Sequence, residues 1–544
     1  MPGITQPPAA PGVAPSLPKP PRPTTPPVSE TGATRPIRNV AVEGVTAFPS
    51  PEIARLTDNL TGPAVHEGQI EAARATLVDL YRSAGYVYTT VRAVIRDQDL
   101  RFIVVEGYIT DVKLEGDVGP VGTQVLRFLD HLINEHPLRT ATLERWLLLA
   151  QDIPGLTVRS TLNPSTGDPG ALTLVAQVSR RPVSGYISAD NRGFQYSGPE
   201  QGLAVANFDS FTALGERTQL SLYRTFNGTS IFGQASEEMF LGGSGLKLRI
   251  YGGAGDNTPS GPLGAIGYNG ETRVFGASLS YPLIRTRPQT LTLSAAFDAI
   301  ESDISNTLGF SGATVRSSFD SLRVLRLGAD YALLDTLLGP DRSAVNVVST
   351  RYSQGLSILG ASRDNDTTTP PPRLGEKVDF SKVGGELSRV QTLLRINQES
   401  TVALRGAVAW QFTGDLLPPE EKFYLGGPTF NRGYYYGQVS GDDAVSTTAE
   451  LQFNTPLPPV PHLPWELSAQ FYTFFDWGRA WQNTSLEANV SLTSTGGGVR
   501  LYVGDRAEID LEGVYRMNRF PNGAGPGVSA LNGAAFYWQL LVHF

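Results

Sequence analysis

The chain has 544 residues, with 58 Gly, 24 Phe, 20 Tyr and no Cys, and its formal net charge is −8. The absence of Cys excludes a disulfide framework and a thiolate metal site, and the negative charge argues against nucleic acid as a partner. No run of about 18 apolar residues predicts a transmembrane helix. If the chain crosses a membrane, a closed β-barrel is the remaining solution, because it leaves no unpaired backbone in lipid.

Residues 1 to 36 are proline-rich, with proline pairs at 7–8, 20–21 and 26–27. Proline excludes a long helix, so this segment is expected to be extended or disordered and to supply no plug helix. Neither the basic region nor the apolar region of a secretory signal peptide is visible. An exported protein needs one, so we expect that the signal has been removed from this chain.

Residues 37–107 change to a small α/β pattern. Ser50 followed by Pro51 indicates the start of a helix. In a longer stretch before Gly85 the apolar residues recur at helical spacing, and Gly85 is placed to end that helix. The expected order is β-α-α-β-β: a strand at Ile37–Gly44, a helix from Ser50-Pro51, a helix at Glu67–Ser83, and strands at Tyr86–Ile95 and Leu100–Val105.

Residues 108–181 repeat the same order, which indicates two copies of one module. Two unrelated small α/β domains are the alternative. The expected elements are a strand at Ile109–Leu114, helices at Gln124–Asn134 and Thr142–Gln151, and strands at Leu156–Leu162 and Leu172–Val178.

Residues 182–544 lose helical periodicity and show alternating apolar runs such as Leu220-Ser-Leu222 and Leu291-Thr-Leu293, separated by turn residues. At about 10 residues per membrane strand, this length fits roughly 16 antiparallel strands, although periodicity alone also allows 14 or 18. Polar spans near 253–272, 303–317 and 360–378 are expected to be outward loops.

The last strand shows the clearest alternation. Its apolar residues, Phe536, Trp538, Leu540, Val542 and Phe544, take every second position. Tyr537, Gln539 and His543 lie on the other face, with Leu541 as the exception. An apolar face toward lipid and a more polar face toward the lumen is the pattern of a membrane barrel strand. A soluble sandwich could show the same alternation.

The stretch Phe423–Gly437 combines glycines and aromatics around one cation, Arg432. A guanidinium in such surroundings is usually held by a carboxylate through two hydrogen bonds. About 40 residues later, Asp476 is the acid of an otherwise aromatic and apolar strand, Phe474–Gly478. We therefore predict that Arg432 and Asp476 form a pair, partly hydrated because a barrel lumen is wet. An ordinary surface ion pair is the alternative.

These residues also carry a resemblance. The segment Asn431, Arg432, Gly433 and Tyr434 resembles the Val-Arg-Gly-Tyr/Phe motif of the outer-membrane superfamily that assembles or exports proteins, with Asn431 in place of Val. There the motif lies at the tip of a loop folded into the barrel. Phe474, Asp476 and Gly478 are similar to its partner motif on the barrel wall.

Further motifs resemble one family within this superfamily. The two modules resemble POTRA domains, and Leu143–Leu149, Ile153-Pro-Gly155 and Leu162-Asn-Pro164 are similar to the pattern in two-partner secretion transporters (the TpsB family). Asp190–Gly193 and Tyr281–Arg285 are similar to barrel signatures of the same transporters.

The resemblance implies an all-β transmembrane barrel of about 16 strands after two POTRA domains: a disordered segment at 1–36, modules at 37–107 and 108–181, and a barrel at 182–544 with an inward-folded loop near 423–440. It also implies that Trp538, Leu540, Val542 and Phe544 form a recognition signal for barrel-insertion machinery.

The function implied is export of an unfolded partner exoprotein, which binds the POTRA domains in the periplasm and crosses the outer membrane of a Gram-negative bacterium through the lumen. The expected partners are that exoprotein, outer-membrane lipid and the insertion machinery, around a monomeric pore. No catalytic or nucleotide-binding motif is visible, so neither enzyme activity, cofactor nor metal is expected. An assembly factor of the same superfamily, and less so a porin or enzyme barrel, are the alternatives.

Overall fold

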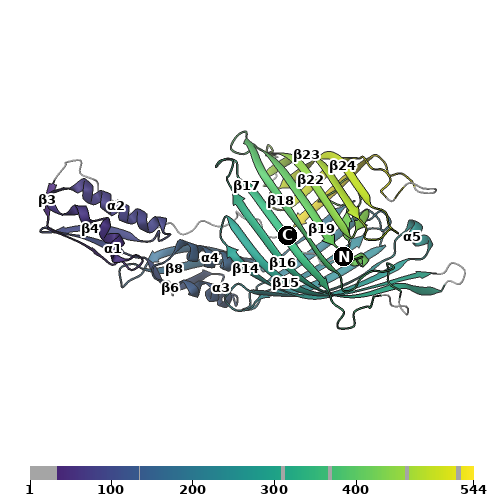
Figure 1. Ribbon diagram of the computed structural model, residues 1–544, viewed down its shortest axis with the longest axis horizontal. Helices are drawn as coiled ribbons and strands as arrows, with labels where there is room; N and C mark the ends of the chain where they lie inside the picture. The colour runs from purple at the N-terminus through teal and green to yellow at the C-terminus, as the bar shows by residue number, and fades with distance from the viewer. Residues whose placement is uncertain are drawn as a thin grey trace.

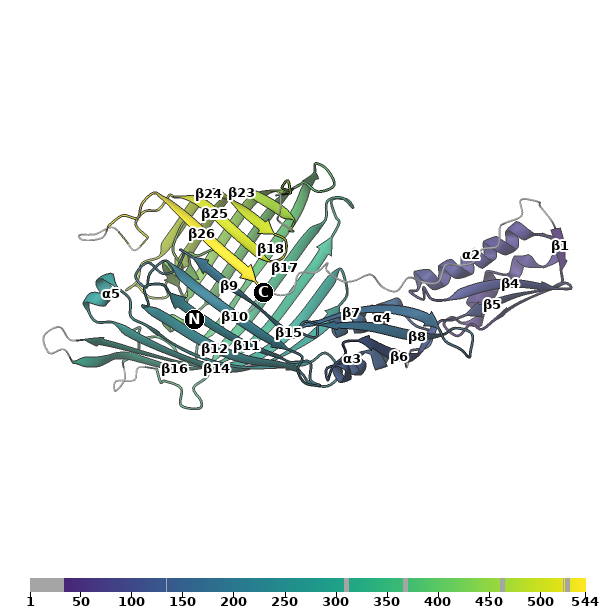
Figure 2. The same cartoon turned by 180° about the vertical axis from the view of Figure 1, so that it is seen from behind.

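The computed structural model describes residues 34–133, 135–307, 313–364, 370–459, 465–521, 523 and 529–544. Two small α/β modules extend in a row from one end of a large β-barrel (Figure 1 and, from behind, Figure 2). Most of the proline-rich segment lies outside the described residues. Its last three residues do not fit the expectation of disorder, because Thr34–Ile37 forms strand β1, which pairs with β3 (Gly62–His66).

The first module follows the predicted order, with β1 and β3 as an added pair. Edge strand β2 runs parallel to the central strand β5, and β4 pairs antiparallel on its other side. Fully buried Leu77, Leu100 and Phe102 form the centre of its core. The remaining elements are β2 (Asn39–Glu43), α1 (Ser50–Arg55), η1 (Asp58–Leu60), α2 (Glu67–Ser83), β4 (Thr90–Arg96) and β5 (Asp99–Val105).

The second module repeats this topology, with sheet order β6-β8-β7. Its core contains Phe128 and Leu143 from the module and, in addition, Phe240 from the barrel. The elements are β6 (Tyr108–Gly116), α3 (Gly122–Leu129), η2 (Asp130–Leu132), α4 (Thr140–Gln151), β7 (Leu156–Pro164) and β8 (Ala171–Arg180).

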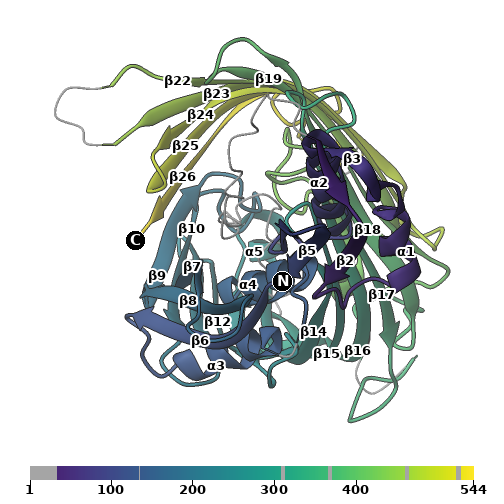
Figure 3. The same ribbon diagram turned by 90° about the vertical axis from the view of Figure 1, so that its left-hand side faces the viewer.

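Sixteen antiparallel strands form a closed barrel, which confirms the predicted fold class. Figure 3 views this barrel from the module end. The strands are β9 (Val183–Asp190), β10 (Gln201–Asp209), β11 (Arg217–Thr225), β12 (Ser230–Phe240), β13 (Lys247–Asn257), β14 (Asn269–Arg285), β15 (Gln289–Thr307), β16 (Thr314–Asp335), β17 (Ala344–Gly355), β18 (Ser381–Arg395), β19 (Thr401–Thr413), β22 (Asp443–Pro456), β23 (Leu467–Trp481), β24 (Val490–Val503), β25 (Ala507–Arg516) and β26 (Ala534–His543).

Side chains of the barrel strands alternate between the two faces of the wall. On β23, Phe471 and Phe475 are exposed on the outside, whereas Tyr472, Phe474 and Asp476 are buried on the inside. This alternation follows from the two-residue period of a strand. Among the residues that the structure describes, no helix is long and apolar enough to cross a membrane.

The second module is fixed to the turns at one end of the barrel. Arg285, at the end of β14, makes two hydrogen bonds of 2.8 and 2.7 Å to the carboxylate of Asp152, and Arg145 donates to the carbonyl of Pro282. The loops that follow β13, β15, β17, β19 and β23 therefore lie at the opposite end, which we call the outer mouth.

Two of the predicted outward loops are shorter than expected, because their strands continue beyond them. The loop after β13 covers only 258–268, including the short helix α5 (Gly261–Ala265), and β15 and β16 extend to Thr307 and from Thr314.

Candidate functional site

The chain between β19 and β22, residues 414–442, folds back into the barrel as an inward-folded loop. Its first regular element is η3 (Pro419–Glu421), and a small hairpin of β20 (Phe423–Leu425) and β21 (Val439–Gly441) follows. The backbone reverses after β20 at Gly426 and Gly427, whose φ angles of +100° and +125° favour glycine. Between the hairpin strands the chain passes through Asn431–Tyr434, the tip of the loop.

Apolar contacts hold the body of this loop on the inner wall. Leu425, Tyr434 and Val439 pack with Ala480 of β23 and Leu492 of β24 in one buried cluster. Burial of such side chains contributes about 1.5–3 kcal/mol each relative to exposure. The hairpin is therefore positioned by packing before any polar contact at its tip is considered.

Strand register places one polar row beneath the tip. Thr448 of β22 pairs with Asp476 of β23, Asp476 pairs with Ser494 of β24, and Ser494 pairs with Arg516 of β25. All four side chains are buried on the inner face. A single line across the wall thus offers a hydroxyl, a carboxylate, a second hydroxyl and a guanidinium to the loop.

The structure brings Arg432 and Asp476 into direct contact. Arg432 Nε lies 3.1 Å from Asp476 Oδ2 and Nη2 lies 3.0 Å from Oδ1, while the Arg432 backbone N–H donates to Oδ2 at 2.8 Å. Arg432 is only 1% exposed and Asp476 is 0% exposed. The expectation of a partly hydrated pair is therefore wrong, because the loop itself excludes solvent from the contact.

Arg432 has further partners besides Asp476. Its Nη1 makes an ion pair with Glu450 of β22, and its Nη2 donates to Thr448 Oγ1 at 2.8 Å. The guanidinium carbon lies 3.6 Å from the centre of the Phe474 ring, a cation–π geometry. One side chain is therefore held by two carboxylates, a hydroxyl and an aromatic face.

Close approach explains the glycines of the two motifs. A Cβ on Gly433 would lie 2.5 Å from Ser494 Cβ, and a Cβ on Gly478 would lie 2.3 Å from Asn431 Oδ1. Asn431 itself has φ +51°, a conformation that Asn adopts more readily than the β-branched Val of the related motif. Its amide donates to the carbonyl of Leu492 and accepts from Ser446.

Tyr434 completes the tip. Its hydroxyl lies 2.9 Å from the carbonyl oxygens of Thr493 and Asn518 and accepts the backbone N–H of Asn518 at 3.1 Å. Tyr434 therefore connects the tip to the chain segment that follows β25.

Besides Glu450, Thr448, Ser446 and Ser494, sequence reasoning missed four more residues that contact the tip or its partners. Arg192 donates to the Arg432 carbonyl at 2.7 Å and pairs with Glu512 at 2.6 Å. Arg516 donates to the Gly433 carbonyl and, at 2.6 Å, to the Tyr537 hydroxyl. Arg192 belongs to Asp190–Gly193, the segment that is similar to a barrel signature of the family. The sequence therefore showed the motif, but not that Arg192 contacts the loop tip.

The predicted assembly residues lie away from this site. Leu540, Val542 and Phe544 are exposed on the outside of the barrel, and Trp538 is half-buried. The strand that carries them closes the barrel by pairing with β9, and the backbone groups of Phe544 exchange two 3.0 Å hydrogen bonds with Gly185.

Comparison with protein families gives a match to haemolysin secretion/activation protein ShlB/FhaC/HecB over residues 171–501, more than half of the chain. The chain belongs to this family. A second match, to the POTRA domain of ShlB type, covers residues 35–107. Membership makes the chain a two-partner secretion transporter of the Gram-negative outer membrane, with its POTRA domains in the periplasm.

Individual relatives are distant in sequence. The heme/hemopexin transporter protein HuxB of Haemophilus influenzae is 20% identical over 461 residues, which cover 83% of this chain and 78% of HuxB. The structure of CdiB from Escherichia coli superposes with a TM-score of 0.71 at 17% identity, covering 98% of this chain and 94% of CdiB. CdiB from Acinetobacter baumannii gives a TM-score of 0.62 at 14% identity, covering 97% and 95%. These structures show the same fold.

The family match decides between the alternatives left open by the sequence. Members of this family export secreted partner proteins, so the predicted transporter is confirmed and the assembly factor is only a related fold. The inner network around Arg432 therefore lies within the export channel of a transporter.

Proposed function

We propose that this transporter receives its partner as an extended chain, by strand addition to β2 of the first POTRA module. The observation that carries this proposal is the environment of β2. It lies at the edge of the three-stranded sheet, so its outer backbone groups have no strand partner within that sheet. An edge strand can accept an extended peptide through main-chain hydrogen bonds, with little demand on the peptide's sequence.

A groove beside β2 supports the same proposal. It has a volume of about 330 Å³ and lies between β2 and α1. Val42 and Val45 line it from the strand side, and Ile53, Ala54 and Thr57 line it from the helical side. An incoming strand would place alternate side chains toward this groove, because side chains of a strand alternate with a period of two.

A substitution that fills the groove tests this docking mode. Ala54 is an exposed groove residue, so Ala54→Trp adds bulk there without changing the core. We expect it to reduce the amount of partner protein secreted while leaving a folded barrel. The matched control is Arg55→Trp, because Arg55 is its exposed neighbour but does not line the groove. Equal secretion by the two variants would contradict docking at β2.

After docking, the partner passes through the barrel lumen. The inward-folded loop occupies part of the inner wall there, so we propose that the loop leaves the row formed by Thr448, Asp476, Ser494 and Arg516 during export. No nucleotide-binding motif is present in the sequence. Folding of the partner outside the cell is the proposed driving force.

The outer surface of the barrel supports two further proposed partners, outer-membrane lipid and the insertion machinery. Outward residues such as Phe471 and Phe536 contact outer-membrane lipid, and the strand ending at Phe544 is the segment recognised by the insertion machinery. A single chain closes the barrel, which supports a monomeric pore as part of this proposal. The protein acts as a transporter without catalysing a reaction.

A further inference from the structure

The contacts around Arg432 hold the tip of the inward-folded loop, but they do not explain how its two ends are held. Glu421, near the first end, is 1% exposed and pairs with wall residues: Arg326 of β16 and Lys382 of β18. Among the residues that the structure describes, no wall cation pairs with the second end, at Asp442. Its partner comes instead from another loop at the outer mouth.

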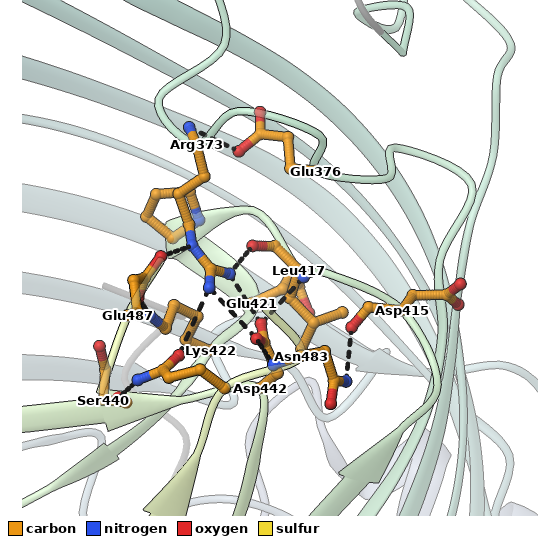
Figure 4. A network of polar contacts seen from close by, with 12 residues as sticks. Arg373, Glu376, Asp415, Leu417, Glu421, Lys422, Ser440, Asp442, Asn483 and Glu487 are labelled. Atoms are coloured by element: carbon orange, nitrogen blue, oxygen red, sulfur yellow. Dashed lines mark hydrogen bonds and ion pairs between the residues drawn. The ribbon is translucent and has the colours of Figure 1, made fainter. Parts of the chain in front are cut away.

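That partner is Arg373, from the loop between β17 and β18. Arg373 Nη1 lies 2.7 Å from Asp442 Oδ1 and Nη2 lies 3.1 Å from Oδ2, which is a two-point contact (Figure 4). Nη1 also donates to the carbonyl of Leu417, at the first end of the loop. One guanidinium therefore contacts both ends of the inward-folded loop.

Arg373 also reaches the outer loop between β23 and β24. Its Nε donates to Glu487 at 2.6 Å, and Glu487 accepts Lys422 Nζ at 2.8 Å. Asp442, Arg373, Glu487 and Lys422 thus form a chain of alternating charges, two negative and two positive (Figure 4). We call these four residues and Leu417 the root clamp.

Backbone contacts complete the root clamp. Asp442 also accepts the N–H groups of Leu417 at 2.9 Å and Asn483 at 2.8 Å. Arg373 is buried and Asp442 is fully buried. Loss of Arg373 would therefore leave a buried carboxylate without its cation, a change far more costly than loss of a surface pair.

We infer that Arg373 is a positioning residue for the inward-folded loop: it fixes the two ends of the loop to each other and to the outer mouth, and so keeps the Arg432 tip on the wall. It acts through Leu417, Asp442 and Glu487, without contact to Arg432. Arg373 thus holds the root of the loop, as Arg432 and its partners hold the tip. The inference rests on the proposed function only in that export requires the loop to move.

A cysteine beneath the loop reports its position. The chain has no Cys, and Ala480 is a fully buried residue covered by Leu425 and Val439. In the Ala480→Cys background, a membrane-impermeant maleimide should label the intact, detergent-purified protein slowly. Adding Arg373→Gln should raise the labelling rate about ten-fold or more, because breaking a buried pair shifts the loop equilibrium by at least that factor.

The matched control is Arg363→Gln. Arg363 belongs to the same outer loop, is exposed, and has no hydrogen-bond or ion-pair partner among the residues that the structure describes. It should label at the parent rate. Arg373→Lys should give an intermediate rate, because an ammonium keeps the charge but cannot make the two-point contact. This graded rescue distinguishes positioning from a general loss of folding.

Equal labelling of the Arg373→Gln and Arg363→Gln proteins would overturn the inference. If Arg373→Gln fails to give a heat-modifiable barrel, Asp442→Asn tests the same contact from the other side, and parent-rate labelling of that variant also overturns it. The assay needs no partner protein. Faster labelling with normal secretion would leave the role of Arg373 intact and would show that export does not depend on how firmly the ends of the loop are held.

Discussion

The POTRA modules and the barrel place their polar and apolar residues in opposite ways. In the first module, Leu100 and Phe102 are buried and polar side chains face water. In the barrel, Phe471 and Phe475 face outward, and the charged residues Arg432 and Asp476 are the buried ones. Burial therefore has different energetic consequences in the two regions.

In the modules, burial removes apolar surface from water and stabilises the fold directly. In the lumen, burial desolvates charges, which is favourable only while each charge has its partner. The lumen residues are accordingly interdependent, whereas core residues of the modules contribute more independently. Each region also contains an exception: Phe240 of the barrel lies in a module core, and Glu106 of the first module is a buried charge.

The largest effect is expected from Arg432→Ala, which removes the shared cation of the lumen network. Asp476 and Glu450 would both remain buried without this partner, and breaking such a contact costs about 3–5 kcal/mol. The closed sheet does not depend on it, so the protein should insert as a heat-modifiable barrel but secrete little partner. Arg479→Ala, on the outer face of the same strand β23, is the matched control; comparable loss of secretion there would contradict the assignment.

A double-mutant cycle sharpens this prediction. Asp476→Ala leaves Arg432 with Glu450, so its effect should be smaller than that of Arg432→Ala. The double variant should resemble Arg432→Ala alone, because both changes remove the same contact. Strictly additive losses of secretion would mean that the two residues act separately.

The sequence predicted those parts of the site that depend on period and local composition. The two-residue period placed Asp476 on one face of its strand, and the glycines around Arg432 indicated close backbone approach. The residues Glu450, Ser494 and Arg516 could not be identified, because their placement around the loop tip depends on the register of four strands. Register is a property of the assembled sheet and its turns.

The sequence also could not predict how far the pair of Arg432 and Asp476 is hydrated. A lumen is wet in general, but the body of the loop, with Leu425 and Val439, covers this part of the wall. The same limit applies to Arg373, which lies in a polar outer loop with no recognisable motif. Its partner Asp442 is 69 residues away in the chain.

The next prediction concerns Phe240, the barrel residue that lies in a module core. Phe240 is 1% exposed, lies at the end of β12, and packs edge-on against Phe128 of the second module, with ring centres 5.2 Å apart. Phe240→Ala should cost about 3–5 kcal/mol of packing free energy. We expect faster hydrogen exchange in α3 and α4 and an unchanged barrel. Phe226→Ala, in an exposed turn at the outer mouth, should leave both helices protected.

The exception on the module side is Glu106, and the smallest effect is expected there. Its carboxylate accepts the N–H groups of Thr46 at 2.9 Å and Ala47 at 3.1 Å, and the Tyr81 hydroxyl at 2.6 Å. It also accepts the hydroxyl of Thr46. This one side chain therefore holds the segment after β2, beside the groove, against helix α2.

Burial alone would raise the pKa of Glu106, but the hydrogen bonds from Thr46, Tyr81 and Ala47 outweigh it and lower the pKa below its ordinary value of 4.5. Because the pKa is lower in the folded state, the charged carboxylate stabilises the module above the ordinary pKa. That contribution is lost as the pH falls through the lowered value. Glu106→Gln should destabilise the first module at neutral pH by about 1–3 kcal/mol.

Hydrogen exchange of the segment around Thr46, corrected for the intrinsic effect of pH, measures this contribution in the full-length protein. At neutral pH the Glu106→Gln protein should exchange faster than the parent. The difference should shrink below the ordinary pKa of Glu106, because the parent loses its charge there while the amide of the variant does not titrate. A difference that stays constant across this range would show that the charge of Glu106 contributes nothing, and that the lumen alone depends on buried charge.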